Sequence, residues 1–171
     1  ELPVRWACLM HDLGKGSTDP QQWPRHIAHE ARSAELAKNM AQRLRVPVEC
    51  RELADVVARE HGNIHRSASL GAAALVRLLE RCDAFRKPQR FTQILLACEC
   101  DARGRAGRAG EPYPQAQRLQ QALEVASAVD TSSVASQASA QGLKGQQVGQ
   151  HIHQARVQAL ESLMNAPGAQ P

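Results

Sequence analysis

Apolar residues recur at helical spacing through most of this chain and do not alternate with polar residues as they would in a half-buried strand. The clearest case is the segment 26–45, HIAHEARSAELAKNMAQRLR, where Ile27, Ala34 and Met40 contribute to one apolar stripe. Aromatic residues make up only 3% of the 171 residues, so Leu, Val and Ala must supply the core. Because chains rich in Ala and Leu favour helices, we predict an all-α fold.

Helix start and stop signals divide the chain into segments. Gly14, Pro47 and Gly62 mark expected helix ends, and Pro88 suits a first helical turn. The predicted helices cover 3–13, 26–45, 48–61, 69–81, 88–103, 114–129 and 146–163, with a short helix within 132–139. We expect a principal domain over 1–129, then a linker and helical tail over 130–171, with residues 165–171 disordered.

Charge and cysteine content narrow the class of protein. The net charge of +4 and the pI of about 9.0 fit a partner that carries phosphates. The five cysteines form no disulfide pattern, and Cys98 and Cys100 fit core filling better than metal or redox chemistry. The lack of a disulfide pattern predicts a cytoplasmic protein, and no segment reads as a signal peptide or a membrane span. Glu1 stands inside an expected helix without an initiator Met, which predicts a fragment of a longer protein.

A His–Asp pair closes the first apolar helix, in the segment LMHDLGKGSTDP. His11 and Asp12 carry donor atoms that divalent metals accept. Adjacent residues at a helix end can bracket one ion from two sides, and Gly14 lets another backbone segment come close. Lys15 would then lie at the mouth of the site, where a phosphate would be.

Other histidines and one aspartate could join this pair. His26 and His29 are three residues apart, on one face of a helix, and His61 and His65 share a face if their helix continues past Gly62. Asp101 ends a long apolar helix, where a buried carboxylate needs a partner.

Less specific interpretations fit the same histidines. The pair His26 and His29 also fits an exposed helix start, and His65 beside Arg66 also fits a solvated loop. His151 and His153 are two residues apart in the last helix, so they cannot share a face, and we interpret them as surface residues.

These motifs resemble a known family. A His–Asp pair closing one helix, with a lone Asp closing a later helix, is similar to the HD superfamily of metal-dependent phosphohydrolases. The segments RWACLMHDLGKG, WPRHIAHEARSAELAKNMAQRLRVP, FRKPQRF and CDARGR, followed by GLKGQQVGQHI, resemble in this order the C-terminal half of bacterial CCA-adding tRNA nucleotidyltransferases that carry an HD domain. The resemblance implies an HD-domain helical bundle with a small C-terminal extension.

The resemblance also implies an activity. It suggests a 2′,3′-cyclic phosphodiesterase, 2′-nucleotidase and phosphatase that uses nickel or magnesium and acts on a tRNA 3′ end or on nucleotide phosphate esters. His11, Asp12 and Asp101 would be metal ligands. His61 would be a functional histidine, for which we predict the general-acid role. Further residues would contact phosphate or, for the histidines, a second metal: Lys15, Arg103, His26, His29 and His65.

Two parts of the family pattern are missing from this sequence. A further His that precedes the His–Asp pair is absent, and so is the N-terminal nucleotidyltransferase domain, which would be a partner within the parent chain. An alternative function is therefore open: a non-catalytic module that binds tRNA or forms a homodimer. An HD hydrolase of a signalling nucleotide is a third, weaker possibility.

Overall fold

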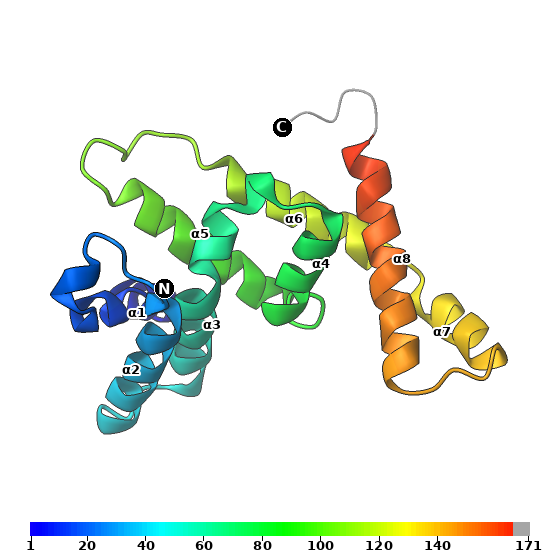
Figure 1. Cartoon of the computed structure of the whole chain (residues 1–171), viewed down its shortest axis with the longest axis horizontal. Helices are drawn as coiled ribbons and strands as arrows, with labels where there is room; N and C mark the ends of the chain where they lie inside the picture. Colours follow the sequence, from blue (N-terminus) through cyan, green and yellow to red (C-terminus); the bar gives the residue numbers. More distant parts are fainter. Residues whose placement is uncertain (166–171) are drawn as a thin grey trace.

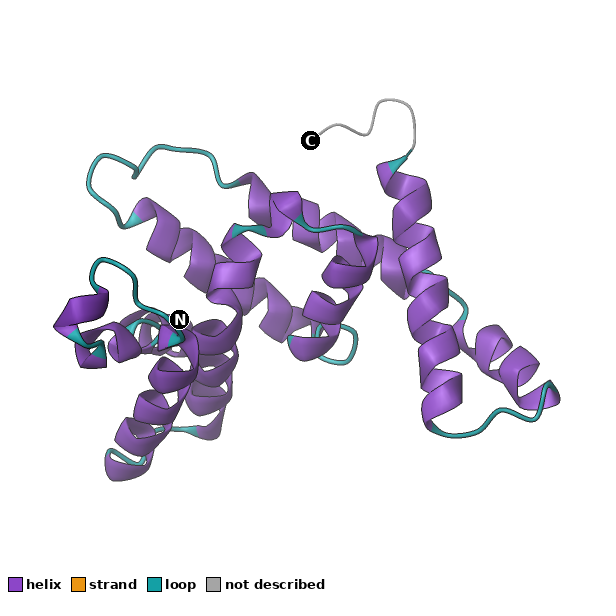
Figure 2. Cartoon of the chain, viewed as in Figure 1, coloured by secondary structure: helices purple, strands orange, loops and turns teal. Residues whose placement is uncertain are grey.

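The computed structural model describes residues 1–165 and shows an elongated helical array (Figure 1). Helices α1, α2 and α3 lie at one end, α7 and α8 lie at the other, and α5 and α6 span the middle. The helices are α1 (Leu2–Met10), α2 (His29–Arg43), α3 (Val48–His65), α4 (Ala72–Arg81), α5 (Pro88–Arg103), α6 (Pro114–Ser127), α7 (Thr131–Ala140) and α8 (Gln146–Met164). Within residues 1–165 there is no strand, which confirms the predicted all-α class (Figure 2).

Proline and capping residues place several helix starts where the sequence predicts them. Pro88 and Pro114 occupy the first turns of α5 and α6, where the missing N–H costs nothing. Asp130 caps α7, because its side chain accepts hydrogen bonds from the backbone N–H groups of Ser132 and Ser133. None of the helices within residues 1–165 is long and apolar enough to cross a membrane.

One apolar core runs through the array and includes the last helix. Leu53, Leu79 and Phe91 are fully buried in it, together with Val157 and Leu160 from α8. Helix α8 packs against α4, α6 and α7. The tail predicted over 130–171 therefore lies on the preceding helices as far as residue 165. The boundary at residue 129 stays a prediction, and the disorder predicted for the tail falls almost wholly outside the described residues.

Four predicted helix limits are wrong. Helix α1 ends at Met10 and continues only as a 3₁₀ turn over Leu13–Ser17, and α2 begins at His29 rather than at residue 26. A separate 3₁₀ turn, Ser67–Ser69, precedes α4, which begins at Ala72.

The fourth error concerns Gly62. We predicted that α3 ends there, but the helix continues to His65. A glycine inside a helix costs about 1 kcal/mol relative to alanine. The burial of His61 and Ile64 on the same helix outweighs this cost of Gly62.

Candidate metal centre

Four helix ends meet at one cluster of polar side chains. His11 and Asp12 follow α1, His29 begins α2, His61 lies in the last two turns of α3, and Asp101 lies near the end of α5. The predicted residues of the His–Asp motif and of the later helices thus come together.

Gly14 permits this close packing. A Cβ atom added at Gly14 would lie 2.3 Å from the carbonyl oxygen of His29 and 2.7 Å from the backbone nitrogen of Ser33. The Gly14 N–H also donates a hydrogen bond of 2.9 Å to the buried Ser33 hydroxyl. The backbone after the His–Asp pair therefore lies directly against the start of α2, as the sequence predicts for this glycine.

Three histidine rings are oriented by backbone carbonyls. Nδ1 of His11 lies 2.8 Å from the carbonyl oxygen of Cys8, Nδ1 of His29 lies 2.9 Å from that of His26, and Nδ1 of His61 lies 3.0 Å from that of Val57. Since a carbonyl only accepts, each Nδ1 carries the hydrogen, and a neutral ring then keeps its lone pair on Nε2. This is the tautomer of a histidine that binds metal through Nε2.

The three Nε2 atoms converge on the Asp12 carboxylate. His11 Nε2 lies 3.3 Å from Oδ2 of Asp12. His29 Nε2 and His61 Nε2 lie 3.3 and 3.6 Å from Oδ1, and they are 3.4 Å from each other. Donor atoms of His11, Asp12 and His61 all lie within 4.8 Å of one another.

Two of these atoms lack any hydrogen-bond partner among the described residues. His11 Nε2 and Asp12 Oδ1 are buried and make no hydrogen bond. Buried polar atoms are rarely left in this state, and an ion is one way to satisfy them. Imidazole nitrogens beside a carboxylate suit a divalent cation of borderline hardness such as nickel, and the carboxylate also suits magnesium. The donor set therefore fits a divalent metal.

The protonation of the cluster follows from its charges. Burial lowers the pKa of His11, but the carboxylates of Asp101 and Asp12 outweigh it and raise this pKa to about 10. Burial and the nearby His11 lower the pKa of His61. Burial opposes ionisation of Asp12, yet His11 and Lys15 hold its pKa well below the usual range. At neutral pH His61 and Asp12 thus offer free lone pairs, and His11 must lose a proton to bind a cation.

Asp101 joins the metal cluster to a second set of residues. Its Oδ1 lies 3.5 Å from His11 Nε2, and its Oδ2 lies 2.8 Å from His65 Nε2. The other nitrogen of His65 lies 2.9 Å from the Tyr113 hydroxyl. The neighbouring rings of His11 and His65 hold the pKa of Asp101 well below its usual range. His65 is therefore a bridge between Asp101 and Tyr113 and does not lie in a solvated loop.

No pattern in the sequence points to Tyr113. It stands in a segment that looks like an ordinary loop, GRAGEPYP, 48 residues after its partner His65. A lone tyrosine before a proline has no distinctive spacing. The part that its hydroxyl plays beside His65 can be seen only from the tertiary contact between the two residues.

Three other predicted residues have different surroundings. Lys15 Nζ donates a hydrogen bond of 2.6 Å to Asp12 Oδ2, so it borders the cluster. His26 precedes α2 and its Nδ1 lies 3.0 Å from the Thr18 hydroxyl, so the shared helix face predicted with His29 is wrong. The Arg103 guanidinium pairs with Glu99 at 2.8 Å.

The remaining histidines and cysteines lie elsewhere. His151 is exposed on α8, while His153 is partly buried and its Nδ1 lies 3.0 Å from Glu80 Oε1. Cys98 is buried in the core and Cys100 is exposed, so core filling holds only for Cys98.

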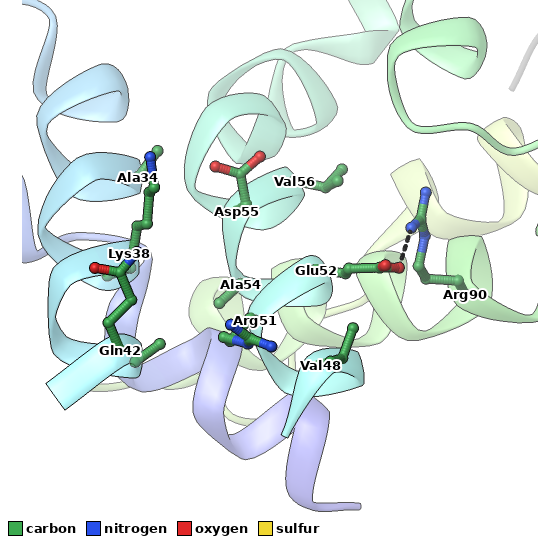
Figure 3. Close-up of a pocket in the computed structure, with 12 residues that line it drawn as sticks. Ala34, Lys38, Gln42, Val48, Arg51, Glu52, Ala54, Asp55, Val56 and Arg90 are labelled. Carbon is green, nitrogen blue, oxygen red and sulfur yellow. Dashed lines mark hydrogen bonds and ion pairs between the residues drawn. The ribbon is translucent and has the colours of Figure 1, made fainter. Parts of the chain in front are cut away.

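A cavity of about 440 Å³ between α2 and α3 does not include the cluster (Figure 3). Small residues such as Ala34 and Ala54 leave it open, and an ion pair between Glu52 and Arg90 lies at one side. Its charged residues are of both signs, and no predicted site residue lines it. This groove is therefore separate from the histidine cluster.

Comparisons with known proteins agree with the resemblance noted from the sequence. The family model "HD domain" matches residues 1–105. The chain is 66% identical to a "Multifunctional CCA protein" of Acidovorax sp. (strain JS42) over 99% of its own length, and 64% identical to that of Polaromonas naphthalenivorans (strain CJ2) over 97%. It is 58% identical to that of Cupriavidus metallidurans over 93%.

The chain spans about two fifths of the length of these relatives, between 38% and 40%. No solved structure gives a significant match. A family model that covers most of the chain, an all-α fold and a His–Asp pair at the meeting point of four helices all agree. This chain belongs to the HD domain family, whose members are metal-dependent phosphohydrolases, and its relatives in that family are multifunctional CCA proteins.

Proposed function

We propose that this chain is a phosphohydrolase that needs a divalent metal, nickel or magnesium, and acts on phosphate esters at RNA 3′ ends. One observation carries the proposal: three histidine Nε2 atoms converge on Asp12, and the buried His11 Nε2 and Asp12 Oδ1 have no hydrogen-bond partner among the described residues. A divalent cation would satisfy both atoms.

His11, Asp12 and His61 would hold the cation, with His29 as a fourth donor. Asp101 lies beside His11 and would complete the set or hold the His11 ring in place. A bound divalent cation supplies two things here: it polarises a phosphoryl oxygen and makes a coordinated water acidic near neutral pH.

The surrounding residues would orient the substrate. Lys15, already beside Asp12, would contact a phosphate oxygen and offset charge that develops during hydrolysis. The lowered pKa of His61 favours a metal-ligand role over the general-acid role that the sequence suggests, because the neutral ring keeps its hydrogen on Nδ1, bonded to the Val57 carbonyl, and has no proton on Nε2 to donate.

The substrate class rests on the relatives. Proteins named for CCA, the 3′ end of tRNA, share up to 66% identity with this chain. We therefore propose 2′,3′-cyclic phosphodiesterase, 2′-nucleotidase and phosphatase activities on tRNA 3′ ends in the cytoplasm. We also propose that the chain acts within a longer protein that carries a nucleotidyltransferase domain, as a monomer or a homodimer.

Hydrolysis of adenosine 2′,3′-cyclic phosphate tests the proposal. The purified chain would be assayed without metal and with nickel, magnesium or manganese, beside His11→Ala and Asp12→Ala. His151→Ala is the matched control, since His151 is exposed on α8. We expect metal-dependent turnover that both site variants abolish and the control retains. Turnover that survives both site variants would contradict the assignment, and no turnover with any metal would favour a non-catalytic RNA-binding or dimerisation module.

A further inference from the structure

A second cavity is lined by His65, the histidine that contacts Asp101. Its volume is about 370 Å³, and we call it the arginine pocket. The residues that define it are His65, Arg103, Arg105, Arg108, Glu111 and Tyr113. They come from the end of α3, the end of α5 and the loop that leads into α6.

Arginines are the main charged groups in the lining of the arginine pocket. Each has one carboxylate neighbour: Glu99 lies 2.8 Å from Arg103, Asp101 lies 3.6 Å from Arg105, and Glu111 lies 3.8 Å from Arg108. The side chains of Arg105 and Arg108 are 60% and 58% exposed, so their guanidinium groups remain open to a ligand. Guanidinium groups bind phosphate through paired, nearly parallel hydrogen bonds.

A turned loop carries two of these arginines, Arg105 and Arg108. Gly107 has φ +81°, a left-handed conformation that other residues rarely adopt. Consecutive turns follow, in which Arg108 N–H bonds to the carbonyl of Arg105 at 3.0 Å and Glu111 N–H bonds to that of Arg108 at 3.1 Å. The positive charge is therefore built into a turned loop rather than spread along an extended segment.

Asp101 links the arginine pocket to the metal cluster. Arg105 lies 3.6 Å from Oδ2 of Asp101, while Oδ1 of the same carboxylate lies 3.5 Å from His11 Nε2. The cluster residue His11 and the pocket residues His65 and Arg105 thus contact one carboxylate through its two different oxygens. A terminal phosphate at the cluster would leave the pocket to a second phosphate of the same strand.

We propose that the arginine pocket binds a backbone phosphodiester of an RNA strand whose terminal phosphate ester lies at the metal cluster. This inference rests on the proposed function and adds a substrate preference to it: a polynucleotide end is favoured over a mononucleotide, which has no second phosphate. Phosphate contacts of this kind position a strand without reading its bases.

The test compares two substrates in one set of variants. The substrates are adenosine 2′,3′-cyclic phosphate and a short single-stranded RNA that ends in a 2′,3′-cyclic phosphate. The pocket variant is Arg105→Gln with Arg108→Gln. The matched control, Arg51→Gln with Arg77→Gln, removes the same charge from exposed positions outside the pocket. Affinity for the RNA is measured separately by fluorescence anisotropy at several salt concentrations, with inorganic phosphate as a competitor.

We expect the ratio of kcat/KM for RNA to kcat/KM for the mononucleotide to fall about tenfold in the pocket variant and to hold in the control. The salt dependence of RNA affinity should also weaken, by about 0.7 in logarithmic slope for each phosphate that the variant no longer neutralises. An unchanged ratio and an unchanged slope would overturn the proposal. Altered competition by inorganic phosphate without a change in the ratio would also overturn it, since the pocket would then be a simple anion site.

Failure of the proposed function gives a different result. If the chain hydrolyses neither substrate with any metal, the phosphohydrolase assignment fails. The anisotropy comparison between the pocket variant and its control would still decide whether the arginine pocket binds RNA.

Discussion

The Nε2 atom of His29 lies 3.4 Å from the Nε2 atom of His61, although the two residues are 32 positions apart in the chain. Each ring has its Nδ1 beside a backbone carbonyl, so two lone pairs face each other across this distance. Two lone pairs at this distance repel each other unless a proton or a cation lies between them. The pair therefore gives the most direct prediction about metal binding.

Replacing His29 with Ala should weaken the binding of nickel by at least about a hundredfold, since even partners outside the ligand set change metal affinity by roughly 10- to 100-fold. Isothermal titration of the purified chain measures this affinity. His151→Ala, on the exposed face of α8, should bind as the wild type does. Equal affinity in His29→Ala would remove His29 from the ligand set.

Metal binding should release about one proton per cation at pH 7 to 8. The pKa of His11 is raised to about 10, so its ring is protonated at this pH and must lose its proton to the cation. His61 and Asp12 contribute none, because both pKa values are lowered. Affinity should consequently fall about tenfold for each unit by which the pH is lowered from about 9 to about 7.

Titration calorimetry in buffers of different ionisation enthalpy counts these protons. His11→Ala should show almost no buffer dependence for whatever binding remains. A wild-type enthalpy that is the same in every buffer would show that His11 binds in its neutral form or does not bind at all.

Gly14→Ala should destabilise the chain by about 1–3 kcal/mol, because a Cβ atom would lie 2.3 Å from the carbonyl oxygen of His29. The start of α2 must then move, and metal affinity should fall together with stability. Gly16→Ala is a matched control two residues away, since nothing lies within 4 Å of its added Cβ. Urea unfolding of both variants compares them, and equal midpoints would contradict the predicted clash.

Leu160→Ala should cost about 2–5 kcal/mol of unfolding free energy, the range for a fully buried leucine. Helix α8 packs on α4 and α6, so the substitution should lower the midpoint of one unfolding transition for the whole chain. Gln158→Ala, at an exposed position of the same helix, should change stability by less than about 0.5 kcal/mol. A separate early transition in Leu160→Ala would instead support an independent tail after residue 129.

Local signals in the sequence account for much of the fold. Prolines at 88 and 114 mark two helix starts correctly, and the predicted segments, including the short one within 132–139, correspond to the eight α-helices of residues 1–165. The errors occur where tertiary contacts override local preference. Burial around Ile64 lets α3 continue past Gly62. The backbone at Gly14 packs against the start of α2, and the residues around His26, which were predicted to be helical, lie before that helix.

The candidate site shows the same limit. His11 and Asp12 stand out as a pair, and Asp101 stands out as a carboxylate at the end of an apolar helix. His29 and Tyr113 join their partners only through long-range packing. Spacing along the chain carries no information about such contacts, so their partners could not be predicted.

The anchoring of the histidine rings to backbone carbonyls has a consequence for how the site assembles. His11, His29 and His61 are each oriented by the turn just before them, so each ring is aimed correctly as soon as its own segment forms. The ligand set, however, exists only when three distant segments have docked. A cation that recognises this set binds the native state and not a partly docked chain, and it stabilises that state by RT ln(1 + [cation]/Kd). Metal titration therefore also reports, at equilibrium, on whether the first third of the chain has completed its folding.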